Sequence, residues 1–390
     1  MPGSDSHDPA VSLLRAVAAP PLAAPPLAAH VARVNDANAW TRTLDLLARH
    51  RLTARAAIRL GAADLPEVVR AEVVAERRDA GVHALAAAAE LTAVLRTLAA
   101  AGIPAMPFKG PTLALAVYGD LSARRMVDVD VVVSPADRQR ALAVLASAGW
   151  QWPTAGTRTR DVLHHWLGHV PVVRAGAVLG VELHWRFAPL ALPWTLPVEE
   201  VLRCAVPVAL ASDPLWRTPQ PSDHLLLLAW HGTRHGWATL EWLSGFAHLL
   251  DACRPDEVDA AASTARRVGG ARALGIAVAS AMRAFDLSVP RSLERLAADP
   301  VARAEATRLV AQMWADPATE TVEAHSWRQH GYWMRCLDSG LARARFIGLS
   351  AVLPTERELE LIRLPEALAG LYYPLRVARV AARALSGRTA

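Results

Sequence analysis

The sequence predicts an α+β protein in which a short β-rich region lies between two helical regions. Four segments with the composition or alternation of strands fall within residues 102–190, and apolar residues recur at helical spacing on both sides of this region. The chain has 390 residues and is 53% hydrophobic, which suffices for two or three domains with cores of their own. We expect N-terminal helices at 31–101, the β-containing core at 102–190 and a helical domain at 191–390.

The N-terminal segment differs in composition from the rest of the chain. It contains AAPPLAAPPLAAH, whose prolines prevent a continuous helix, so we expect a flexible arm at residues 1–30. Helical periodicity then runs from Asn38 to Leu60 and from Leu65 to Ala101. These helices carry apolar stripes and must pack against another part of the chain.

The expected core begins at Gly102, where the pattern changes. IPAMPF, MVDVDVVVS, VPVVRAG and VLGVELHWRF are rich in β-branched residues or alternate with a period of two, and we interpret each as a strand. PADRQRALAVLASAGW predicts a helix with Ser134 at its N-cap, Pro135 in its first turn and Gly149 at its end. Further along, SDHLLLLAWHGTRHG and LEWLSGFAHLLDACR predict amphipathic helices.

Charge and cysteine content narrow the class of protein. The formal net charge is +5 and the arginines are spread along the chain, which argues against a nucleic-acid partner. Three cysteines without metal-site spacing predict neither a disulfide framework nor a zinc site, and they fit a reducing compartment. The sequence shows no signal-peptide pattern and no uninterrupted apolar run of about 18 residues. We therefore expect a cytoplasmic protein without a transmembrane segment.

The alternation in VDVDVVV carries the strongest chemical signal. It directs Asp128 and Asp130 to one face of a strand and the alternate valines to the other. Two adjacent carboxylates repel each other unless cations lie between them, and paired Mg²⁺ ions are common partners in phosphoryl transfer. In VELHW, Glu182 and His184 share one face, so Glu182 supplies a third carboxylate if the two strands are neighbours. The alternative is a solvated strand face that carries charges without a ligand.

The segment PFKGP contains Lys109, the only lysine among the 42 lysines and arginines of the chain. A strand before it and the helix TLALAVYG after it put Gly110 at a helix N-cap and Pro111 at the first helical position. A helix N-terminus attracts phosphate through free backbone N–H groups, glycine allows close approach, and lysine supplies a compact charge. Chance in an arginine-rich chain is the alternative explanation for a lone lysine.

Other polar residues have two interpretations each. Arg124, four residues before Asp128, either contacts a phosphate or forms a structural salt bridge. His224, His231 and His235 lie near one side of a predicted helix, where they either hold a metal or line the substrate cleft, although the zinc-protease pattern is missing. The arginine stripe in PLRVARVAARALSGR either contacts a membrane or an acidic partner, or is solvated.

The order of these elements resembles the DNA polymerase beta-like nucleotidyltransferase superfamily, and most closely its uncharacterised nucleotidyltransferase family. The motifs KG, Y-x-D, R-x-x-x-D-x-D and E-x-H-W appear here as Lys109-Gly110, Tyr118 to Asp120, Arg124 to Asp130 and Glu182 to Trp185. The resemblance spans residues 100–255 and implies a small mixed β-sheet nucleotidyltransferase core. Two departures stand out: the superfamily's Gly-Ser pair is Gly110-Pro111 here, and the acidic residue expected near Gly245 is missing.

The resemblance implies a magnesium-dependent transfer of a nucleoside monophosphate from a nucleoside triphosphate to a hydroxyl acceptor, such as a small molecule, peptide or saccharide. Asp128, Asp130 and Glu182 would hold two Mg²⁺ ions, or Glu182 would take the proton of the attacking hydroxyl. By the same resemblance, the nucleotide would contact Lys109, Gly110 and Arg124, and the cleft would be lined by Tyr118, His184 and His231. The alternatives are a catalytically silent scaffold that binds a nucleotide or peptide, and a toxin-type nucleotidyltransferase that modifies RNA or protein.

Overall fold

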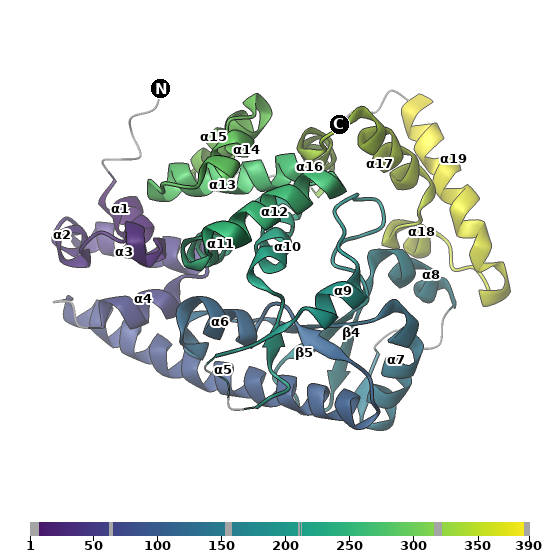
Figure 1. The fold of residues 1–390 in the computed structure, drawn as a ribbon, viewed down its shortest axis with the longest axis horizontal. Coiled ribbons are helices and arrows are strands. Elements are labelled where there is room, and N and C mark those ends of the chain that lie inside the picture. The colour runs from purple at the N-terminus through teal and green to yellow at the C-terminus, as the bar shows by residue number, and fades with distance from the viewer. Residues whose placement is uncertain are drawn as a thin grey trace.

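A computed structural model describes residues 8–61, 65–152, 158–209, 211, 213–315 and 322–385. It confirms the α+β class, because a small mixed sheet is enclosed by helices from both sides (Figure 1). The helices before the sheet are α1 (Pro9–Ala18), α2 (Leu27–Val31), α3 (Ala37–Arg49), α4 (Thr53–Leu60) and α5 (Glu67–Ala100), with the 3-10 helix η1 (Pro21–Ala23) after α1.

Helix α1 lies where the sequence led us to expect a flexible arm. Pro9 occupies its first turn, and the side chain of Asp8 accepts hydrogen bonds from backbone N–H groups there. Leu13 and Leu14 are fully buried in the main hydrophobic core. The repeated prolines lie beyond the end of α1, where they interrupt no helical hydrogen bond. Residues 1–7 of the expected arm lie outside the described residues.

The sheet has the strand order β1-β2-β5-β4-β3. Its strands are β1 (Ala105–Pro107), β2 (Asp128–Val133), β3 (Trp150–Gln151), β4 (His169–Arg174) and β5 (Gly180–His184). The pair β2 and β5 is parallel, and the other neighbouring pairs are antiparallel. The four expected strands are confirmed. The sequence did not predict β3, because its 2 residues are too few to show an alternation.

Short helical elements connect these strands. They are α6 (Pro111–Tyr118) and η2 (Leu121–Ala123) after β1, η3 (Pro135–Asp137) and α7 (Arg138–Ser147) after β2, and α8 (Arg158–Leu167) after β3. Ser134 caps η3, as the sequence predicts, because its hydroxyl accepts the N–H of Ala136 at 3.2 Å.

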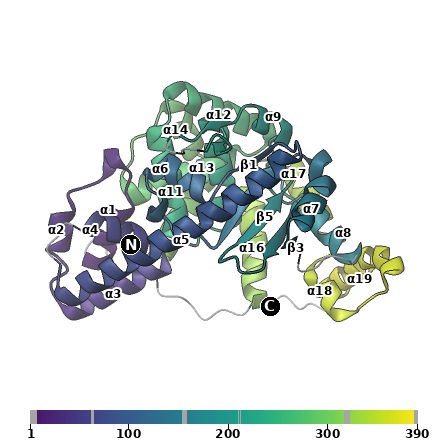
Figure 2. The same cartoon turned by 90° about the horizontal axis from the view of Figure 1, so that it is seen from below.

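The two faces of the sheet are covered by different helices. Val129 packs with Leu91 and the rest of the α5 stripe, and Figure 2 shows α5 crossing this side of the molecule. Val132 points the other way and shares the main core with Leu225 of the later helix α10. Asp130, two residues from Val132, therefore lies on the face that α10 covers.

Helix α5 is, among the described residues, the one helix whose length and composition would allow it to cross a membrane. Ala84, Ala87, Leu91 and Leu98 of α5 are buried against the sheet. Such burial is typical of the core helix of a folded domain.

The region after the sheet is helical, as expected, apart from a small hairpin. Its elements are α9 (Val198–Arg203), β6 (Val206–Pro207), β7 (Arg217–Thr218), α10 (Pro221–Arg234), α11 (Leu240–Ala252), α12 (Pro255–Val268), α13 (Ala271–Phe285), α14 (Arg291–Ala297), α15 (Pro300–Trp314), α16 (Val322–Cys336), α17 (Gly340–Val352), α18 (Glu356–Leu361), η4 (Glu366–Leu371) and α19 (Tyr372–Leu385). Leu13 of α1 and Leu47 of α3 share one core with Phe246 of α11 and Leu274 of α13. The N-terminal helices and this region thus stabilise each other.

The arginine stripe of the C-terminal tail contacts the protein itself. Arg376 Nη1 lies 3.5 Å from Oε1 of the fully buried Glu358, and Arg379 Nε forms a shorter bond to the same oxygen. These two arginines therefore tie α19 to α18. The side chain of Arg383, the third member of the stripe, lies outside the described residues.

Candidate active site

The PFKGP turn connects β1 to α6. Gly110 is the N-cap of α6 with φ 65° and ψ −137°, a conformation that favours glycine. The hydroxyl of Thr112 donates to the carbonyl oxygen of Lys109 at 3.1 Å. Nε2 of His224, in α10, lies 3.0 Å from the carbonyl oxygen of Phe108. The turn is thus held between α6 and α10.

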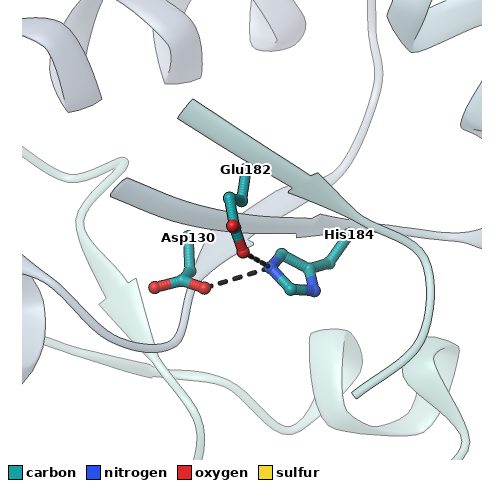
Figure 3. Close-up of side chains that lie close together, drawn as sticks. All are labelled: Asp130, Glu182 and His184. Carbon is teal, nitrogen blue, oxygen red and sulfur yellow. Dashed lines mark hydrogen bonds and ion pairs between the residues drawn. The ribbon is translucent and has the colours of Figure 1, made fainter. Parts of the chain in front are cut away.

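The parallel pairing of β2 and β5 brings the acidic residues together. Asp130 lies opposite Glu182, and Val132 lies opposite His184. Figure 3 shows His184 reaching both acids: its Nε2 lies 3.0 Å from Asp130 Oδ1 and 3.1 Å from Glu182 Oε2. The two acidic strands are therefore neighbours, as the prediction of a third carboxylate requires.

Lys109 also reaches this group. Its Nζ lies 2.6 Å from Asp130 Oδ1, and both side chains are buried. The lone lysine and the double-aspartate strand thus belong to one site. Asp128 opens β2 opposite Gly180 and, two residues before Asp130, lies on the same face of the strand. We call Asp128, Asp130 and Glu182 the carboxylate cluster.

The three carboxylates have different electrostatic environments. Burial, followed by the charges of Asp130 and Glu182, raises the pKa of Asp128 to about 6. Burial alone would also raise the pKa of Asp130, but Lys109 and His184 outweigh it and hold that pKa below its usual range. For Glu182, the hydrogen bond with His184 overcomes burial and lowers the pKa to about 2. Asp128 is thus the member of the cluster whose negative charge is least compensated.

The chemistry of the donor set fits a hard divalent cation. Asp130, Glu182 and His184 offer ligand atoms within 4.8 Å of one another, and no other group of this kind occurs among the described residues. His184 donates from Nε2 to the two carboxylates, and these bonds raise its pKa although burial opposes the shift. His184 thus holds Asp130 and Glu182 in position, and the three side chains together could hold a metal ion.

Arg124 forms the salt bridge that was one of its two predicted roles. Its Nε donates to Glu241 Oε1 at 2.6 Å, and both side chains are largely buried. Glu241 lies in the first turn of α11, one turn before Gly245.

Tyr118, which we expected in the cleft, is the last residue of α6 and packs between polar side chains of α4 and α11. The guanidinium carbon of Arg55 lies 4.4 Å from its ring centroid, and the ring of His248 packs edge-on at 5.0 Å. Burial, then the charge of Glu241, raises the pKa of Tyr118 to about 12. This neighbourhood connects α6 to α4 and α11.

The three histidines of the α10 region do not converge on a metal site among the described residues. His224 bonds to the backbone of Phe108, whereas the rings of His231 and His235 pack against each other at 4.7 Å between centroids. His231 has a pKa well below its usual value because of burial and then the charge of Lys109. The lining of a substrate cleft by His231 stays a prediction.

Sequence reasoning missed two neighbours of the site. His169 of β4 stacks on His184 at 4.9 Å between ring centroids. The second neighbour is Arg234, at the end of α10, whose pKa is lowered by burial, a shift that the charges of Glu182 and Asp130 oppose. Neither residue stands in a motif, so only the packing of β4 and α10 around β5 reveals them.

The mixed sheet, the glycine turn and the paired acids on β2 and β5 together define the α+β class of nucleotidyltransferases. The chain belongs to the family described as uncharacterised nucleotidyltransferase, whose model matches residues 36–286. The match includes every strand of the main sheet and α10 and α11. The protein is thus a nucleotidyltransferase, and its family implies a nucleoside triphosphate substrate. The search of curated proteins found no match.

Proposed function

We propose that this nucleotidyltransferase moves a nucleoside monophosphate onto a hydroxyl group of a small-molecule, peptide or saccharide acceptor, with Mg²⁺ held by the carboxylate cluster. The strongest support for this function is that Asp130 of β2, Glu182 of β5 and Lys109 of the PFKGP turn lie at one site. A solvated strand face would not bury Asp130 against a lysine and a histidine.

The reaction is an in-line displacement. The acceptor oxygen attacks the α-phosphorus, a new O–P bond forms, and the bond to the bridging oxygen breaks as pyrophosphate leaves. Bound Mg²⁺ supplies charge neutralisation on the phosphates. Glu182 either holds the second ion or takes the proton of the attacking hydroxyl, and His184 keeps the two carboxylates in register.

We assign the PFKGP turn to the binding of the leaving phosphates. Lys109 supplies a compact positive charge, and the positive end of α6 favours an anion. Pro111 contributes no N–H, so the N–H groups at the start of α6 without an intrahelical partner are those of Gly110, Thr112 and Leu113. Gly110 lets a phosphate approach the backbone closely.

Transfer of label tests this proposal. The protein is incubated with each α-labelled triphosphate, Mg²⁺ and a cell extract, beside the matched variants Asp128→Asn and Asp130→Asn. Label should appear on a small molecule, peptide or saccharide only with the wild type. Label on RNA or a protein would favour the toxin-type alternative. Nucleotide binding without any transfer would favour the silent scaffold.

A further inference from the structure

One arginine and three aromatic rings meet at the C-terminal end of α10. They are His231, Arg234 and His235, with Trp242 of α11 beside them, and all four side chains are half-buried. The ring centroid of Trp242 lies 5.2 Å from that of His231 and 5.3 Å from that of His235. We call these four residues the α10 cluster.

Two contacts fix α10 over the acidic face of the sheet. Val132 of β2 and Leu225 of α10 lie in the same core, and His224 bonds to the carbonyl oxygen of Phe108. At the other end of α10, the carbonyl oxygen of Arg234 accepts hydrogen bonds from Trp333 Nε1 and a glutamine of α16, each at 2.8 Å. Arg234 therefore has a fixed backbone position.

The guanidinium of Arg234 bonds to a histidine instead of an acid. Its Nε and Nη2 donate to Nε2 of His235 at 3.1 Å and 2.8 Å. Within the described part of the chain, no carboxylate lies within ion-pair distance of Arg234. A half-buried guanidinium normally pairs with an anion, because burial without one is costly. Arg124, deeper in the same protein, has such a partner in Glu241.

The charges of the site act on this arginine. Burial lowers the pKa of Arg234, whereas Glu182 and Asp130 raise it. Arg234 and Lys109, after burial, lower the pKa of His235 to about 3. Two cations, Arg234 and Lys109, thus approach the carboxylate cluster from α10 and from the glycine turn.

On the basis of the proposed function, we propose that Arg234 binds the β- and γ-phosphates of the nucleoside triphosphate and that His235 is its positioning residue. A planar guanidinium can bind two phosphate oxygens at once, and the contact with His235 uses only one side of it. The ligand class is a polyphosphate, since a nucleoside monophosphate lacks the groups that Arg234 would contact.

Calorimetric titration with the four non-hydrolysable triphosphate analogues and the four monophosphates, in Mg²⁺, tests this inference. Arg234→Ala should lower triphosphate affinity by about 10- to 100-fold, the range of a charge-assisted hydrogen bond, and leave monophosphate affinity unchanged. Arg234→Lys, which keeps the charge, should lose less. Arg78→Ala is the matched control, because Arg78 is exposed on α5 away from the sheet's acidic face.

Two variants of His235 test its positioning role. His235→Gln keeps an acceptor for the guanidinium and should retain triphosphate affinity better than His235→Ala does. Equal losses in these two variants would overturn that role. Unchanged triphosphate affinity in Arg234→Ala, or an equal loss for monophosphates, would overturn the role of Arg234. Wild-type protein that binds triphosphates but transfers nothing would refute the proposed function while leaving the phosphate contact supported. Wild-type protein that binds no triphosphate would refute both.

Discussion

Lys109 Nζ lies 2.6 Å from Asp130 Oδ1, in a site where both side chains are buried. The only lysine of the chain thus neutralises an aspartate that we propose as a metal ligand. An ammonium is a compact point charge that can leave this position, whereas a guanidinium is larger and planar. Lys109 and a bound cation would therefore compete for Asp130, and the displaced ammonium would be available to the phosphates.

Replacing Lys109 should change nucleotide and cation affinities in opposite directions. Lys109→Arg should bind a non-hydrolysable triphosphate more weakly than the wild type, and Lys109→Ala more weakly still, by about 1–3 kcal/mol. Lys109→Ala should bind Mn²⁺ alone more tightly, because Asp130 loses its competing ammonium. Titration calorimetry measures both quantities. Unchanged affinities in both variants would mean that the lysine is unrelated to phosphate and metal.

Neutralising either aspartate should abolish transfer but shift stability in opposite directions. Asp128→Asn removes a carboxylate that Asp130 and Glu182 repel, so the metal-free protein should unfold at a higher temperature. Asp130→Asn leaves Lys109 without its carboxylate and should cost about 3 kcal/mol of the free energy of unfolding. Thermal unfolding in excess chelator measures the two shifts. Substantial turnover in either variant, or in chelator, would contradict the metal assignment.

The buried pair of Arg124 and Glu241 should matter more for stability than a pair on the surface. Glu241→Gln leaves a buried guanidinium uncompensated and should cost about 3–5 kcal/mol, whereas the double variant with Arg124→Met should recover part of this loss. Urea unfolding measures these free energies. Asp256→Asn, which breaks the exposed pair with Arg254, is the control and should have little effect. An equally small effect of Glu241→Gln would show that water reaches the buried pair.

Local patterns predicted which face each site residue occupies, but not which partners meet. The period of two in VDVDVVV and VELHW was enough to place Asp130 and Glu182, because strand alternation is a property of neighbouring residues. The contact of Arg124 with Glu241 spans 117 positions, and no local pattern encodes it. Arg234 could not be recognised at all, since its lack of a carboxylate partner among the described residues depends on the whole surrounding structure.

The flexible arm shows how a local rule can be applied too widely. Proline breaks a helix only where it stands inside one, and the proline repeat follows α1 instead of interrupting it. The apolar residues of VSLLRAV, including Leu13 and Leu14, were visible in the sequence and indicate a buried helix face. The core that buries them is built from helices more than 200 positions away, such as α11 and α13, which the local pattern could not reveal.

The buried ring of His50 should make stability depend on pH. Its Nδ1 accepts the N–H of Leu240 at 3.2 Å, and its Nε2 donates to the carbonyl oxygen of Met313 at 2.9 Å, so the neutral ring satisfies both partners. Burial is the main reason that its pKa falls from 6.5 to about 4, with Arg49 adding to the shift.

Because the folded-state pKa of His50 lies below the unfolded one, its contribution is fully present above about pH 6.5 and is lost as the pH falls toward about 4. His50→Gln, which keeps a donor and an acceptor but does not titrate, should therefore lose less stability than the wild type between about pH 7 and pH 5, by roughly 2 kcal/mol. Urea unfolding at both pH values measures the difference. Parallel pH profiles for His50→Gln and the wild type would show that His50 accepts a proton in the folded protein as readily as in the unfolded chain.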